Sequence, residues 1–171
     1  MTFMSRRHLV LRIFFVVCLA VASLAEAGTV QELSFERLIA ESDVIVRGRV
    51  EELKTRQASD QRSIMTIVKV SVERQFKGPI ITSLRIEQPG GTIGDIVQGV
   101  PGLPEFSSDE KVIIFLKHHR RDAYRIVGGK QGKFTIKTLP NKNEVVEDLA
   151  HRTEALDTFV DRLTNTIKRG N

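Results

Sequence analysis

The sequence predicts a mainly β protein: a small antiparallel β-barrel of five to six strands, with a short helix before it and an amphipathic helix after it. Alternating polar and apolar residues recur through the middle of the chain, between segments rich in turn residues. A helical period appears only near the two ends. The best fit is a five-stranded Greek-key barrel of the oligonucleotide/oligosaccharide-binding (OB) type, and a two-sheet sandwich is the alternative.

Residues 1–27 have the features of a secretory signal peptide. Three arginines precede an uncharged, mostly apolar run, Ile13–Ala25, which is shorter than a membrane-spanning helix requires. Small residues at Ala25 and Ala27 are typical of cleavage before Gly28. An uncleaved N-terminal anchor is the alternative. We therefore expect an exported protein, either periplasmic or extracellular, with no stable membrane span after cleavage.

Cleavage at that point would change the composition. The chain has 171 residues, a formal net charge of +5 and one cysteine, Cys18. The removed segment holds this cysteine, three arginines and one glutamate, so 144 residues with a charge of +3 would remain. No disulfide, cysteine nucleophile or cysteine metal ligand is then possible. The charge is typical of a mixed surface rather than a surface that binds polyanions.

The barrel domain is expected to span residues 28–140 and to begin with a helix. Thr29 and Glu32 have the spacing of a capping box, and the apolar face that follows ends before Asp43. Six strands come next. They are Asp43–Lys54, Ile64–Phe76, Ser83–Gln88, Lys111–Lys117, Tyr124–Gly129 and Lys133–Lys137.

Details of three strands can be predicted from their alternation. Gly48 in the middle of the first strand indicates a bend or bulge. In the second strand, Lys69 and Glu73 are expected to face outward, because the opposite register would bury both charges. In the third strand, Arg85 and Glu87 are also expected to face outward.

Residues 141–171 are expected to form a linker and a C-terminal helix with Thr153 as its N-cap. The apolar residues at helical spacing are Leu156, Phe159, Val160, Leu163 and Ile167. Five apolar residues are about what one surface helix needs to pack on its own domain. Docking onto a partner is the alternative.

The longest connection is the glycine-rich stretch Gln88–Phe106, which holds five glycines and three prolines. Gly90 and Gly91 provide a positive φ for a tight turn, and the stretch lacks the signatures of phosphate-binding loops. We expect an ordered lid over one end of the barrel, with a ligand-binding loop as the alternative, because long connections are often functional. The expected apolar anchors of the lid are Ile93, Ile96, Val97, Val100, Leu103 and Phe106.

Carboxylates gather around this lid. Asp95, Glu105, Asp109 and Glu110 form a loose group, of which two can converge for acid–base catalysis. Asp109 and Glu110 are also typical of a capped turn before a strand.

The densest basic cluster is Lys117–Asp122, between two strands. It suits an acidic partner, a polysaccharide or anionic lipid, and it equally suits a solvated hairpin tip. Its candidate contact residues are Lys117, His118, His119, Arg120 and Arg121. The two adjacent histidines would point to opposite faces of a strand, so they are poor joint metal ligands.

Recognisable catalytic motifs are absent from the sequence. It contains neither His-Glu-x-x-His nor Gly-x-Ser-x-Gly. The aromatic residues lie mostly within apolar patterns, whereas single-stranded nucleic acid requires stacking aromatics on a basic groove. We therefore expect no enzyme, no metal, no cofactor and no nucleic-acid ligand.

Three stretches resemble an uncharacterised family of small exported bacterial proteins. They are Glu41–Val50, Ile67–Pro79 and Gln131–Lys137. The resemblance covers Phe35–Lys137 and implies the fold and export, because the activity of that family is not established.

A more distant similarity is to the netrin-type module, the barrel of the tissue inhibitors of metalloproteinases. Ser42–Ile45 and Phe76–Pro79 carry it. Those inhibitors place an N-terminal cysteine amine on the protease zinc, and the chain from Gly28 has no cysteine. The resemblance implies the fold and not that mechanism.

Together these observations predict an exported, non-catalytic binding module for a protein or an extracellular polymer. The barrel mouth, the lid and the basic tip are the expected contact surfaces. The alternatives are a periplasmic hydrolase that uses the lid carboxylates, and a netrin-like regulator of proteases without the zinc-chelating cysteine.

Overall fold

Helix α2 (Phe35–Glu41) opens residues 32–170, the part of the chain that this computed structural model describes. Ser34 is its N-cap, with a side chain that accepts a hydrogen bond from the Arg37 backbone N–H. The helix therefore does not begin with the capping box expected at Thr29 and Glu32, and that prediction was wrong. Thr29 and the predicted signal peptide lie outside the described residues.

Strands β1 (Val44–Gln57) and β2 (Ile64–Lys77) form a long antiparallel hairpin. Strand β1 runs three residues past Lys54, the predicted end of the first strand, because its polar end continues to pair with β2. The pairing shifts register at Gly48. A Cβ there would lie 2.3 Å from the Ser71 carbonyl oxygen, so only glycine fits. The predicted bulge is confirmed.

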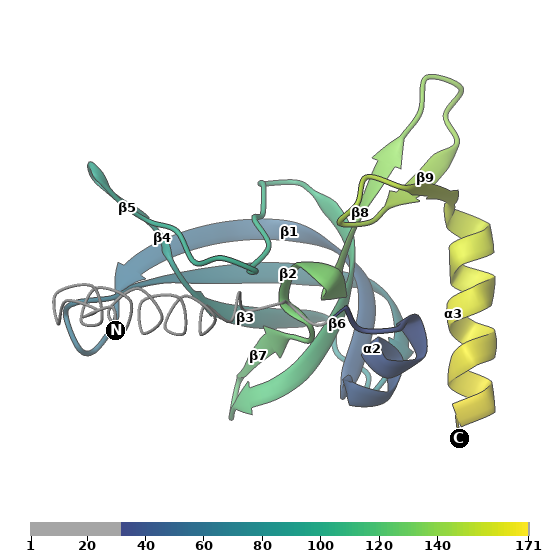
Figure 1. The fold of residues 1–171 in the computed structure, drawn as a ribbon, viewed down its shortest axis with the longest axis horizontal. Coiled ribbons are helices and arrows are strands. Elements are labelled where there is room, and N and C mark those ends of the chain that lie inside the picture. The colour runs from purple at the N-terminus through teal and green to yellow at the C-terminus, as the bar shows by residue number, and fades with distance from the viewer. Residues whose placement is uncertain (1–31, 171) are drawn as a thin grey trace, which may run out of the picture. The chain divides into compact units, whose positions relative to one another are not determined.

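The remaining strands extend this hairpin into an eight-stranded sheet in the order β1-β2-β3-β7-β6-β8-β9-β10, with a further pairing between β1 and β6 (Figure 1). The additional strands are β3 (Ser83–Pro89), β6 (Lys111–Arg120), β7 (Ala123–Ile126), β8 (Lys133–Thr138), β9 (Glu144–Glu147) and β10 (Thr153–Ala155). All pairs in this sheet are antiparallel except β3–β7, which meet at one residue pair, Ile86 and Tyr124. The mainly β class is confirmed. The sheet is not a cleanly closed barrel, so the OB type stays a prediction.

The segment expected to be a linker instead contains β9 and β10, which pair with each other and through β9 with β8. Thr153 lies in β10, and helix α3 (Leu156–Gly170) begins three residues later. Thr153 is therefore not the N-cap of this helix. Local sequence gave no sign of these strands, since they are only four and three residues long and show no alternation of apolar residues.

Strand β6 divides the apolar interior into two clusters. Val112, Ile114 and Leu116 join an inner cluster with residues of β1, β2 and β3. Ile113 and Phe115 face a second cluster beneath α2 and α3. Burial on both faces explains why the sequence of β6 is almost continuously apolar.

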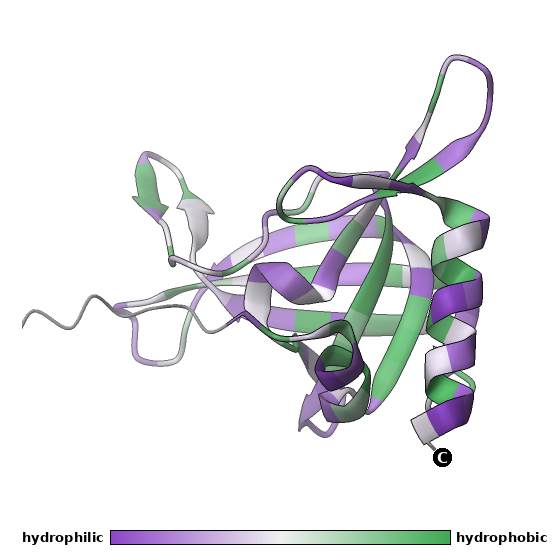
Figure 2. Cartoon of the chain, turned by 45° about the vertical axis from the view of Figure 1, so that its right-hand side comes forward, coloured by the Kyte–Doolittle hydropathy of each residue, from purple (hydrophilic) through white to green (hydrophobic). Residues whose placement is uncertain are grey.

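Helix α3 covers the second cluster with an apolar stripe, and its polar side faces outward (Figure 2). Leu156, Phe159, Val160 and Leu163 are buried, and Ile167 packs against the same cluster. The prediction that this helix covers its own domain is confirmed. Neither this helix nor any other in residues 32–170 has the length and apolarity needed to cross a membrane.

Candidate functional site

The glycine-rich stretch folds as a hairpin followed by an irregular segment, and not as one lid. Strands β4 (Gly91–Ile93) and β5 (Ile96–Gln98) pair only with each other, around a turn at Gly94 and Asp95. Two expected anchors are exposed, Ile96 by 66% and Val97 by 74%. They mark the apolar tip of this hairpin (Figure 2). Their prediction as packed anchors was wrong, because the hairpin holds them away from the main sheet.

The start of the stretch is fixed to β2. The Gly90 N–H donates to the Ile64 carbonyl oxygen at 2.7 Å, and Thr66 Oγ1 donates to the Gly90 carbonyl oxygen at 2.7 Å. Gly90 and Gly91 have φ values of 95° and 132°. A Cβ on Gly91 would lie 2.5 Å from Thr66 Oγ1. The predicted positive φ of both glycines is confirmed, but the predicted tight turn is not found there, because Gly90 joins β3 directly to β4. Close contacts and positive φ explain both glycines.

The end of the stretch is fixed to other elements. Lys130 lies in the short 3₁₀ helix η2 (Gly129–Gly132). Its N–H donates to the Gly102 carbonyl oxygen at 2.8 Å. The Gln88 side-chain Nε2 donates to the Pro104 carbonyl oxygen at 2.9 Å. Hydrogen bonds within the protein therefore fix both the start and the end of the stretch, which form the two walls of a pocket.

A pocket of about 670 Å³ lies between these two walls. Its apolar lining includes Leu53, Val97, Val100, Leu103 and Phe106, and Glu105 and Lys130 contribute charged groups. Ligand pockets of proteins have this size and this mixture of apolar walls with a few polar groups. The predicted lid residues Gly90 and Gly91 also line it, whereas Asp95 lies at the hairpin turn.

Gln88 gives the pocket a specific polar group. Its Nε2 is committed to Pro104, which fixes the orientation of the amide. Its Oε1 is buried and has no hydrogen-bond partner among residues 32–170. A buried acceptor without a partner is costly and is rare in native structures. Because Oε1 has almost no accessible surface, it is enclosed in the pocket wall and is not open to the pocket.

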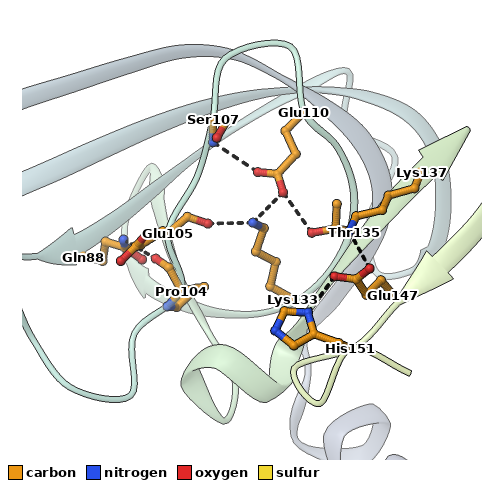
Figure 3. Close-up of polar contacts among 10 residues, drawn as sticks. All are labelled: Gln88, Pro104, Glu105, Ser107, Glu110, Lys133, Thr135, Lys137, Glu147 and His151. Atoms are coloured by element: carbon orange, nitrogen blue, oxygen red, sulfur yellow. Dashed lines mark hydrogen bonds and ion pairs between the residues drawn. The ribbon is translucent and has the colours of Figure 1, made fainter. Parts of the chain in front are cut away.

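Glu110 and Lys133 anchor the segment behind this pocket (Figure 3). Glu110 Oε1 accepts hydrogen bonds from Lys133 Nζ at 2.6 Å and from Thr135 Oγ1 at 2.8 Å. Glu110 Oε2 accepts from the Ser107 N–H at 3.1 Å. Lys133 Nζ also donates to the Glu105 carbonyl oxygen at 2.6 Å and lies 4.8 Å from the centre of the Phe106 ring. Both oxygens of Glu110 therefore hold the chain that carries Phe106.

The other carboxylates of the predicted group have separate positions. Asp109 is exposed, has a φ of 62° and donates its backbone N–H to Val50. Glu105 is exposed at the pocket. Within residues 32–170 no group of three His, Cys, Asp or Glu side chains has an arrangement that holds a metal ion.

The basic cluster forms the tip of the β6–β7 hairpin, as the sequence predicts. Lys117 lies opposite Arg125, and the exposed Arg121 is in the turn after Arg120. The His118 ring packs against Tyr124, with ring centres 4.7 Å apart.

His119 sits where the β6–β7 register shifts, and its Nε2 is buried without a partner among the described residues. Burial and the positive charges of Arg125 and Arg120 lower its pKa below the ordinary value of 6.5. His119 is therefore neutral at neutral pH.

Sequence reasoning missed two neighbouring side chains on β3. Gln88 was not singled out, and Glu87 was expected to face solvent. Glu87 does face away from the inner cluster, yet it is only 3% exposed, and arginines of β1, β3 and β6 surround it. No local signal reveals either position, since all of these contacts except that of Arg85 join segments far apart in the chain.

No protein-family model matches this chain, and a search of curated proteins found no relative. The resemblances to the exported bacterial family and to the netrin-type module therefore stay predictions. The function must be argued from the geometry of the site.

Proposed function

We propose that this protein is an exported, non-catalytic binding module that holds a protein segment or an extracellular polymer in the pocket of the glycine-rich stretch. The apolar pocket carries the proposal, together with Val97, which lines it and is 74% exposed. An exposed apolar side chain beside a pocket is a surface that a partner would cover.

The walls of the pocket support binding rather than bond cleavage. They are fixed from β2 at one end and from η2 at the other, so little ordering entropy is lost when a ligand enters. Val97 extends the apolar lining onto the exposed hairpin tip. Glu110, the most buried of the predicted catalytic carboxylates, is committed to structural hydrogen bonds.

The OB-type barrel is part of the same proposal. Strands β1, β2, β3, β7 and β6 are joined by a ring of pairings, of which the β3–β7 step is the weakest. A five-stranded, partly open barrel has such a ring, and its connecting loops commonly bind ligands.

Loss of the apolar hairpin tip should abolish partner capture. Protein purified from expression of the full chain would be immobilised and exposed to an exported-protein fraction, with bound material quantified by mass spectrometry. We expect Val97→Asp to reduce recovery of the specific partner at least about tenfold, since it places a charge in the apolar contact. Gln88→Leu should also reduce it, because the hydrogen bond from Nε2 that holds Pro104 in the pocket wall is lost.

Ile80→Asp is the matched control. Ile80 is 95% exposed in the turn after β2 and does not line the pocket. It should leave recovery unchanged. Equal recovery by the wild type and both pocket variants would contradict the proposal, as would an Asp109→Asn variant that keeps capture but loses hydrolysis of a periplasmic substrate.

A further inference from the structure

Glu87 is buried on the face of β3 that does not contribute to the inner cluster. Leu84 and Ile86, which alternate with it, belong to that cluster, so Glu87 points to the opposite side. Its Oε2 is enclosed and has no hydrogen-bond partner within the described part of the chain. A carboxylate that simply faced solvent would keep its hydration, so the burial of Glu87 needs another explanation.

Three arginines from three strands converge on this carboxylate. Arg85 Nη2 lies 3.3 Å from Oε1, and Arg56 Nη2 lies 3.9 Å from the same oxygen. Arg120 Nη1 lies 4.0 Å from Oε2. These distances exceed the 2.7–2.9 Å of a charge-assisted hydrogen bond. Glu87 thus attracts the guanidinium groups by charge without occupying their N–H donors.

The guanidinium groups remain accessible. The side chains of Arg56, Arg85 and Arg120 are 47%, 46% and 66% exposed, although the carboxylate between them is buried. Each guanidinium carries five N–H donors in a planar fork. The three guanidinium groups thus surround the buried carboxylate and are partly open to solvent.

Positive charge exceeds negative charge at this point. Arg125 and Arg120 are both close enough to His119 to lower its pKa, and Glu87 is close enough to oppose them. Arg125 also lies directly opposite Lys117 in the antiparallel β6–β7 pair. Like charges opposite each other destabilise a sheet. We call Arg56, Arg85, Arg120 and Glu87 the arginine cluster; its formal charge is +2.

We propose that the arginine cluster binds the phosphate group of an anionic ligand. A tetrahedral oxyanion accepts hydrogen bonds from several directions, which matches donors that arrive from β1, β3 and β6. Arginine forks bind phosphate in a bidentate manner. Glu87 is a positioning residue here, because its charge holds the guanidinium groups together against their mutual repulsion. None of the cluster residues lines the pocket, so this site is separate from the pocket of the proposed function.

The test measures phosphate binding by protein purified from expression of the full chain, using isothermal titration calorimetry. The probes are inorganic phosphate, a short polyphosphate, and phosphatidylcholine vesicles with and without phosphatidylglycerol. We expect Arg85→Gln and Arg120→Gln each to weaken binding about tenfold, the value of one hydrogen bond between charged groups. Binding should also weaken as salt rises from about 50 to 200 mM.

Arg62→Gln is the matched control, because it removes the same charge from an exposed position in the β1–β2 connection. It should change the affinity less than about twofold. All variants should retain the circular dichroism spectrum of the wild type, since each replaced side chain is exposed.

The probes also distinguish the source of the phosphate. Binding of inorganic phosphate indicates a free anion, binding of polyphosphate alone indicates a polymer, and binding only of vesicles with phosphatidylglycerol indicates a lipid headgroup. The proposal is overturned if no probe binds, if Arg85→Gln and Arg120→Gln bind as the wild type does, or if Arg62→Gln weakens binding as much as they do.

Discussion

Glu87 and Glu110 are two mostly buried carboxylates with opposite surroundings. Glu110 accepts hydrogen bonds at both oxygens, from Lys133, Thr135 and Ser107. Glu87 is surrounded by arginines that do not hydrogen-bond to it. The sequence placed Glu110 near the lid correctly but could not reveal its role, because two of its partners are 23 and 25 residues away. Burial alone therefore does not distinguish a structural carboxylate from a functional one. The distinction rests on whether the protein provides hydrogen bonds to both carboxylate oxygens.

Glu110→Gln should destabilise the protein. The change leaves Lys133, whose side chain is only 11% exposed, without its carboxylate. Breaking a mostly buried charge pair by removing one partner costs about 2–4 kcal/mol. Urea unfolding would measure this loss. Glu105→Gln, at an exposed side chain whose backbone carbonyl makes the contact with Lys133, should change stability by less than about 0.5 kcal/mol. Equal effects of the two changes would contradict the anchoring role of Glu110.

At the level of elements, the sequence predicted the strands whose alternation is local and missed those that depend on distant partners. The second strand was located within one residue of β2, because Val68 and Val70 alternate with polar residues. Strands β9 and β10 were missed, since residues such as Glu144, Glu147 and Thr153 show no apolar alternation. The β4–β5 hairpin was missed because its glycines also suit a lid.

Strand β9 is held to the sheet by charge as well as by pairing. Glu144 accepts hydrogen bonds from Lys111 of β6 at 2.7 Å and from Arg47 of β1 at 3.0 Å. The Lys111 contact is the main reason that the pKa of Glu144 lies below its ordinary value of 4.5, with Arg47 acting in the same direction. These contacts add to the burial of Val146 in fixing β9 to the main sheet.

The contribution of Glu144 to the free energy of unfolding should be lost at acidic pH. A depressed folded-state pKa means that the stabilisation is present above the ordinary value of 4.5 and is lost as the pH falls through the lower, folded-state pKa. We expect the wild type to exceed Glu144→Gln in stability by about 1–2 kcal/mol at pH 7. The difference should shrink toward zero as the pH falls below 4.5. Urea unfolding across this range measures it.

Glu41→Gln provides the control, because Glu41 forms an exposed ion pair with Arg37 within helix α2. Such pairs contribute less than about 1 kcal/mol. If the difference between the wild type and Glu144→Gln did not change with pH, the assigned role of Glu144 would be wrong.

For the whole molecule, β6 lies between the two apolar clusters and therefore couples the stability of one to that of the other. Ile114 lies in the inner cluster and Phe115 in the cluster beneath the helices, so one strand supports both. The inner cluster was predictable from alternating aliphatic residues. The second cluster was only partly predictable, because no local pattern shows that α2, α3 and β8 meet on the same face of β6.

Unfolding of residues 32–170 should accordingly be a single transition. The chain has one tyrosine and no tryptophan, so the fluorescence of Tyr124 reports on the inner cluster, whereas circular dichroism includes the signal of α3. Phe159→Ala empties part of the second cluster and should cost about 3–5 kcal/mol. Because β6 serves both clusters, we expect this change to lower the urea midpoint of both signals by the same amount. Val70→Ala, in the inner cluster, should also lower the urea midpoint of both signals equally, but by a smaller amount. A helical signal that melts first, while Tyr124 fluorescence keeps its wild-type midpoint, would show that the two clusters are independent.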